Sequence, residues 1–155
     1  YLQDGLLHLP LTPDGWFPTG DMGHFDACGR LCVFGRKDNR FVTRGENVYP
    51  EEIEQQLAEL DCVEEAVIVP IPHEAHGMVP IAFIRMKTGQ DDCAQKVLPE
   101  SMAQEIRSAL AAVMPHYKLP ARYYTWPSEM PPYRAKPDRL AWQALALNQT
   151  RNYLV

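Results

Sequence analysis

A lysine near the C-terminal end of the chain is the side chain best suited to assist a reacting phosphate or oxyanion. Lys136 stands in the segment 131–139 (PPYRAKPDR), where prolines restrict the backbone just before an expected helix. An ammonium group held there is a point charge that can stabilise negative charge developing on an oxygen. A solvated surface lysine is the alternative, and local chemistry alone favours it.

Two polar residues earlier in the chain suit a nucleotide. Asp21 follows a threonine and a glycine, and a carboxylate after a glycine turn can accept hydrogen bonds from adjacent hydroxyls such as a ribose diol. The alternative is an aspartate that closes a turn through its own backbone. Arg36, in the segment 35–40 (GRKDNR), offers a forked donor to phosphate or ribose oxygens. A charged turn between two strands explains the same residues without a ligand.

Other polar and aromatic residues are assigned to structure. His73 and His76 lie between two expected strands and lack the further ligands that a metal site needs. The carboxylates of Glu51 and Glu52 suit the positive end of a helix dipole. The aromatic residues of segment 121–126 are expected in the core rather than against an adenine ring.

Composition bounds the class of protein. The chain has 155 residues, 46% of them hydrophobic, which is enough for one domain with a modest core. The formal charge of −5, with both signs dispersed, argues against a nucleic-acid or anionic-membrane partner. The four cysteines are expected to be free thiols, which suits a cytoplasmic protein, and no apolar run approaches the roughly 18 residues of a membrane span. Because the chain begins at Tyr1 rather than Met, we expect a fragment or a processed chain.

The elements that position these residues follow from periodicity and turn signals. Glycine at positions 35 and 45 allows backbone conformations closed to other residues. Ser101 and Gln104 form a capping box that would start the second of three helices. The pattern predicts an α+β fold, a small mixed sheet of about three strands flanked by helices and preceded by a β-hairpin region. The expected helices are 50–60, 101–113 and 139–147, and the expected strands are 31–35, 41–43, 63–71, 79–86 and 121–126.

The order of the motifs resembles one superfamily. TGD, GRKDN, RGENVYPEEIE and the late lysine loop follow one another between residues 15 and 147, as in the adenylate-forming acyl-CoA synthetases, carrier-loading adenylation domains and luciferases. The resemblance implies a large N-terminal domain with a mobile C-terminal lid. Residues 1–37 would be the end of the large domain, 38–150 the lid and 151–155 a frayed tail.

The resemblance also implies roles for individual residues. Asp21 would bind the ribose hydroxyls of ATP, Arg36 would assist there, and Asp38 would be the hinge of the lid. Lys136 would contact the carboxylate and the α-phosphate while the substrate acid attacks Mg²⁺-bound ATP to form an acyl-adenylate and pyrophosphate. The lid would then swing, so that the loop of Gly45 and its neighbour lines the path by which the thiol of coenzyme A displaces AMP.

Some features depart from the superfamily pattern or leave alternatives open. Ala135 replaces the usual glycine before the lysine and Pro137 replaces a β-branched residue, which stiffens the loop, and Lys118 is a second candidate for the lysine. Segments 44–52, 76–83 and 119–124 resemble the o-succinylbenzoate–CoA ligases of menaquinone biosynthesis. Another acid–CoA ligase, a carrier-loading enzyme and a stand-alone interaction module remain alternatives, and a homo-oligomer stays open.

Glu46 completes the predicted thiol channel beside its glycine neighbour. No protein residue of this chain is predicted to bind a metal. The carboxylate pocket would lie in the large N-terminal domain of the same enzyme, which is the expected partner of the lid.

Overall fold

The computed structural model describes residues 2–3, 6–7, 10–87, 97–128 and 137–151. The helices are α1 (Pro50–Ala58), α2 (Glu100–Ala111) and α3 (Arg139–Arg151), with short 3₁₀ turns η1 (Lys37–Asn39) and η2 (His116–Lys118). The strands are β1 (Leu2–Gln3), β2 (Leu6–Leu7), β3 (Asp21–Phe25), β4 (Leu31–Arg36), β5 (Phe41–Thr43), β6 (Glu46–Val48), β7 (Val63–His73), β8 (Gly77–Met86) and β9 (Arg122–Thr125).

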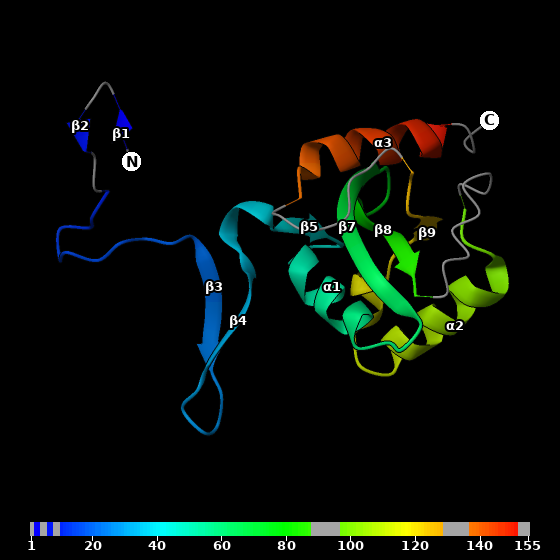
Figure 1. The fold of residues 1–155 in the computed structure, drawn as a ribbon, viewed down its shortest axis with the longest axis horizontal. Helices are drawn as coiled ribbons and strands as arrows, with labels where there is room; N and C mark the ends of the chain where they lie inside the picture. The colour runs from blue at the N-terminus through cyan, green and yellow to red at the C-terminus, as the bar shows by residue number, and fades with distance from the viewer. Residues whose placement is uncertain (1, 4–5, 8–9, 88–96, 129–136, 152–155) are drawn as a thin grey trace.

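A mixed five-stranded sheet forms the centre of the rounded body in Figure 1. Four of its strands follow the order β6-β5-β8-β7, and each neighbouring pair among them is antiparallel. The fifth strand, β9, pairs with β8 in the parallel direction. The α+β prediction is confirmed, but the sheet has more strands than the expected three. The β5–β6 hairpin joins it because Thr43 pairs with Gly77 at the start of β8.

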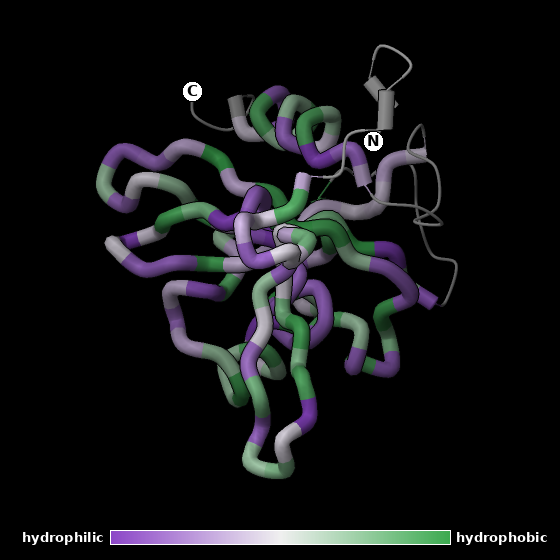
Figure 2. Tube along the Cα trace, turned by 90° about the vertical axis from the view of Figure 1, so that its left-hand side faces the viewer, coloured by the Kyte–Doolittle hydropathy of each residue, from purple (hydrophilic) through white to green (hydrophobic). Residues whose placement is uncertain are grey.

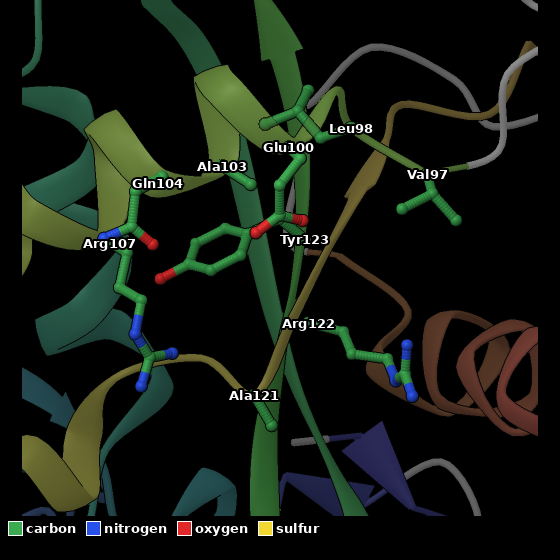
Figure 3. Close-up of a pocket in the computed structure, with 9 residues that line it drawn as sticks. All are labelled: Val97, Leu98, Glu100, Ala103, Gln104, Arg107, Ala121, Arg122 and Tyr123. Carbon is green, nitrogen blue, oxygen red and sulfur yellow. The ribbon is translucent and has the colours of Figure 1, made fainter.

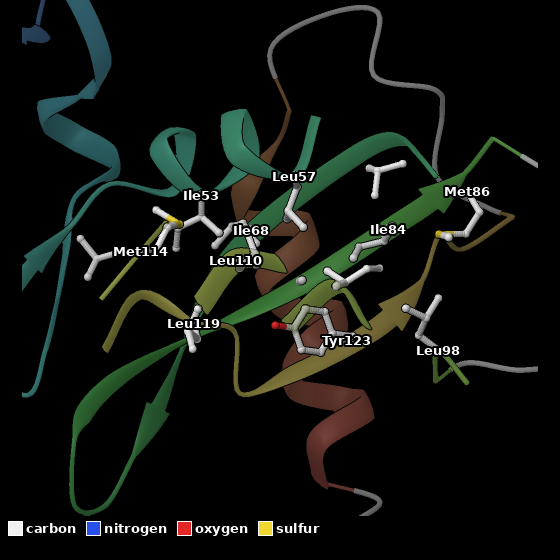
Figure 4. Packing of buried hydrophobic residues seen from close by; sticks show 14 of the residues in the cluster. Ile53, Leu57, Ile68, Ile84, Met86, Leu98, Leu110, Met114, Leu119 and Tyr123 are labelled. Carbon is white, nitrogen blue, oxygen red and sulfur yellow. The ribbon is translucent and has the colours of Figure 1, made fainter. Parts of the chain in front are cut away.

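Side-chain alternation along the strands produces three layers. Ile68, Ile84 and Tyr123 face α1 and α2 and form one buried cluster with residues of those helices (Figure 4). Their neighbours on the opposite face, such as Phe83 and Tyr124, pack against α3. This is the period-2 pattern of a sheet covered on both faces, and it confirms that the aromatic residues of segment 121–126 belong to the core.

The first helix begins as its sequence indicates, whereas the second does not. Pro50 occupies the first helical turn of α1, and Ile53 and Leu57, one turn apart, are completely buried. The predicted Ser101 capping box is wrong, because α2 begins at Glu100 after Pro99 and no side chain caps its first turn. Pro99 (φ −51°, ψ 136°) is the residue just before the first helical turn, so the helix starts before the serine.

The turn of the β3–β4 hairpin projects away from the rounded body (Figure 1), and the hairpin carries hydrophobic positions along its length (Figure 2). Phe25, Leu31 and Val33 are 72%, 62% and 56% exposed. Such a surface suits a segment that packs on another part of a protein. This agrees with the assignment of residues 1–37 to a larger domain, which stays a prediction. None of the helices within the described ranges is long and apolar enough to cross a membrane.

Candidate functional site

The β3–β4 hairpin brings Asp21 and Arg36 together. The two residues face each other in the strand register, and Arg36 Nη1 donates hydrogen bonds to Asp21 Oδ1 at 2.9 Å and to the Thr19 carbonyl at 3.1 Å. One carboxylate oxygen is therefore fixed by a charge-assisted bond. The Asp21 side chain stays 42% exposed, so the carboxylate can still accept hydrogen bonds from an incoming ligand.

A glycine permits this arrangement. Gly20 has φ +79°, and a Cβ atom there would lie 3.0 Å from Arg36 Nη2. The Thr-Gly-Asp motif therefore needs glycine for its backbone conformation, and a second reason for glycine is that a Cβ atom would crowd the guanidinium. The sequence alone did not indicate the second reason.

Asp38 lies between two anchored segments. On its N-terminal side, the Lys37 amide donates to the Gly20 carbonyl at 2.8 Å. On its C-terminal side, Asn39 Nδ2 donates to Glu51 Oε1 on α1. The Asp38 side chain is 77% exposed and lies 3.7 Å from Arg36 Nη2. The residue predicted to be the hinge thus lies in the short turn η1, between a contact to the hairpin and a contact to α1.

Gly45 forms the tip of the β5–β6 hairpin. Arg44 (φ 52°) and Gly45 (φ 86°) both have left-handed backbone, the requirement of a two-residue type I′ turn. Gly45 therefore adopts a left-handed backbone conformation that other residues rarely adopt, as its sequence position suggested. Gly35 does not have a positive φ. Arg44 is held by its amide, which donates to the His76 carbonyl at 2.9 Å, and by its guanidinium, 3.0 Å from His76 Nε2. Because a guanidinium can only donate, His76 Nε2 must accept.

A basic pocket opens beside this hairpin. Its volume is about 290 Å³. Its lining includes five basic side chains and no carboxylate, namely Arg44, His73, His76, Arg107 and His116. Apolar groups, among them Val79 and Leu119, complete the wall. A pocket of this composition suits an anion attached to a partly apolar group.

A smaller pocket of about 150 Å³ shares Arg107 with the first. In Figure 3, the ring of Tyr123 from β9 reaches toward Gln104 and Arg107 of α2. Burial raises the pKa of Tyr123 to about 12, although the neighbouring Arg107 charge opposes the shift. Glu100 also lines this space, so it is less suited to an anion than the first pocket.

Lys136 lies outside the described residues, but the segment that follows it is anchored firmly. Asp138 Oδ1 accepts hydrogen bonds from the Leu140 and Ala141 amides and so caps α3. Arg139 donates to both oxygens of Glu54 at 2.7 and 2.9 Å.

The Arg139 guanidinium makes further bonds, which connect α3 with the sheet and with α1. It donates to the Ile68 carbonyl at 2.7 Å and to Glu51 Oε1 at 3.2 Å. Sequence reasoning assigned Glu51 to the helix dipole and missed this role. The acidic run at the start of α1 was the available signal, but it does not reveal a partner more than 80 residues away.

Lys118, the second candidate for the lysine, has a structural partner. Its ammonium lies 2.6 Å from Glu52 Oε1, and its side chain is only 14% exposed. A cation held in this way is not directed at a ligand. Glu52 therefore also has a long-range partner in addition to its place at the helix N-terminus.

The described histidines and cysteines form neither a metal site nor a disulfide. His73 and His76 stack with ring centroids 4.5 Å apart. No group of three or more His, Cys, Asp or Glu side chains in the described ranges is arranged to hold a metal ion. Cys28, Cys32 and Cys62 are free thiols, as expected.

Comparison with known proteins identifies the family. Residues 52–136 match the model of the AMP-binding enzyme C-terminal domain. The chain belongs to this family. It is also similar to the 2-succinylbenzoate–CoA ligase of Geobacillus kaustophilus, with 39% identity over 110 residues, which cover 71% of this chain and 21% of that protein.

The other similarities agree with this assignment. The 2-succinylbenzoate–CoA ligase of Salmonella typhimurium is 33% identical over 153 residues, which cover 98% of this chain and 31% of that protein. The chain thus spans less than a third of the length of these relatives. Its structure resembles a variant of E. coli MenE with bound OSB-AMS, with a TM-score of 0.72, 26% identity, and coverage of 93% of this chain and 28% of that one.

A second solved structure is also similar. The o-succinylbenzoate CoA synthetase (MenE) of Bacillus subtilis in complex with the acyl-adenylate intermediate OSB-AMP has a TM-score of 0.60 and 30% identity. The similarity covers 74% of this chain and 21% of that one.

Proposed function

We propose that the chain is the C-terminal part of an ATP-dependent acid–CoA ligase, and that its acid is o-succinylbenzoate. One observation carries the proposal. In a chain of the AMP-binding family, Asp21 and Arg36 form a pair directly beside Asp38, at the junction between the hairpin and the body. The relatives named 2-succinylbenzoate–CoA ligase support the choice of acid.

In the first half-reaction the substrate carboxylate attacks the α-phosphorus of ATP and releases pyrophosphate. Asp21 accepts hydrogen bonds from the ribose hydroxyls, with Arg36 fixing its direction. Lys136 places its charge against the carboxylate and α-phosphate oxygens, where negative charge develops. Mg²⁺ would enter bound to the ATP phosphates.

In the second half-reaction the thiol of coenzyme A attacks the acyl carbonyl and AMP leaves. The lid turns at Asp38, and the hairpin of Gly45 and Glu46 lines the thiol path. The basic pocket beside this hairpin supports coenzyme A as the thiol carrier. Arg107 and the histidines would face the phosphates of its nucleotide part, and Tyr117 and Leu119 its apolar part.

The test is ATP–pyrophosphate exchange by the full-length protein across a panel of carboxylic acids. We expect exchange that depends on the acid and is strongest with o-succinylbenzoate. Strong exchange with a different acid would reassign the substrate, and no exchange with any acid would support the stand-alone interaction module. Offering coenzyme A against a thiol-bearing carrier protein separates the CoA ligase from a carrier-loading enzyme.

A further inference from the structure

Strand β4 packs directly on the start of α1, and the contact depends on a glycine. A Cβ atom at Gly35 would lie 2.9 Å from Glu51 Oε2, and 3.0 and 3.1 Å from the Cβ and Cδ1 atoms of Tyr49. Side chains do not tolerate approaches this close without movement of the neighbours. The adjacent Phe34 ring meets the Tyr49 ring edge-on, with centroids 5.0 Å apart. A Cβ atom at position 35 would therefore force Tyr49 and the end of the Glu51 side chain to shift, which disfavours this packing.

The contact joins residues on opposite sides of Asp38. Gly35 precedes that residue and belongs to the hairpin, whereas Tyr49 and Glu51 follow it and belong to the body. A rotation centred on Asp38 would separate the glycine from both partners. The packing at Gly35 is therefore specific to the orientation that the structure shows.

Unpaired polar atoms limit how strongly this contact holds. Glu51 Oε2 and Arg36 Nε are both buried without a hydrogen-bond partner. Leaving such atoms unpaired is unfavourable, because each has lost its hydrogen bonds to water. This cost opposes the contact, so the contact does not lock the lid in one orientation.

We infer that Gly35 is a positioning residue that permits the lid orientation seen in this structure. Any side chain at position 35 disfavours this orientation, while the second orientation of the lid, reached by rotation at Asp38, remains accessible. The inference rests on the proposed function, in which each half-reaction uses its own orientation. Gly35→Ala then slows the half-reaction that takes place in the orientation seen here. It does not slow the other half-reaction to the same extent.

The experiment measures both half-reactions of the full-length enzyme: ATP–pyrophosphate exchange, and thioester formation from supplied acyl-adenylate. For Gly35→Ala, we expect the ratio of the two rates to change by about 10-fold or more. Tyr49→Ala loosens the same contact from the other side, so it should move the ratio in the same direction. Gly23→Ala is the matched control, because its Cβ would lie 2.9 Å from the Cys32 carbonyl within the hairpin itself. The control should leave the ratio unchanged.

An unchanged ratio in Gly35→Ala would overturn the inference, as would a shift of the opposite sign in Tyr49→Ala. If Gly35→Ala does not fold, the ratio in Tyr49→Ala decides, and an unchanged ratio there also overturns it. These outcomes differ from failure of the proposed function. In that case the wild-type enzyme itself would show no acid-dependent exchange.

Discussion

Replacement of Arg139 by methionine should destabilise the fold far more than loss of an ordinary ion pair. The guanidinium is 15% exposed and binds Glu54 at 12% and Glu51 at 25% exposure. Without it, two partly buried carboxylates lose the cation that pairs with them, and breaking such a pair costs about 3–5 kcal/mol of unfolding free energy. For a domain of this size the midpoint of thermal unfolding should fall by roughly 6–20 °C.

Urea unfolding measures the loss directly, provided that the slope of free energy against denaturant stays the same. Arg30→Met is the matched control, because Arg30 is 78% exposed in its pair with Asp26, and such a pair contributes at most about 1 kcal/mol. Glu54→Gln in the Arg139→Met background should recover part of the loss, since it removes one charge and keeps an acceptor for the Ile68 amide. An Arg139→Met loss no larger than that of Arg30→Met would refute this reasoning.

Further variants test the assigned roles. Asp21→Asn in the full-length enzyme should raise the KM for ATP by about 10-fold, because it removes a charged acceptor; an unchanged KM would remove Asp21 from the nucleotide site. Lys136→Ala should slow adenylate formation by about 100-fold or more and spare thioester formation from supplied acyl-adenylate; equal losses would contradict its role. The pKa of Tyr123, about 12 when folded against 10.0 for the free side chain, implies a pH effect. The unfolded chain loses this proton first, so the free energy of unfolding should fall between pH 10 and 12, by an order of 2 kcal/mol. Tyr123→Phe should reduce that fall in urea titrations at each pH, and an undiminished fall would assign it to other groups.

Local sequence patterns predicted the elements whose signals are local. Pro50 and the spacing of Ile53 and Leu57 located α1, and β-branched runs located β7 and β8. Strand β6 was missed because only Val48 in it is buried and its composition is polar. The Arg44-Gly45 turn was the available signal, since two residues with left-handed backbone join strands in a hairpin.

The long-range part of the site could not be read from spacing. The order of motifs placed Asp21 and Arg36 in one functional group, and the strand register brings them together. The partners of Arg139, by contrast, lie 85 and 88 residues earlier in the chain. Gly35 looked like a residue of special backbone conformation, but its role is to leave space for α1. Such contacts depend on how elements pack, which periodicity does not specify.

Product analysis of the full-length enzyme tests the central claim most directly. The protein is incubated with ATP, Mg²⁺, o-succinylbenzoate and coenzyme A, and the products are separated and identified by mass. An acid–CoA ligase of this family should form o-succinylbenzoyl-CoA, AMP and pyrophosphate in equal amounts, and no thioester without ATP. Absence of a thioester with every acid tried, or release of ADP in place of AMP, would contradict the account.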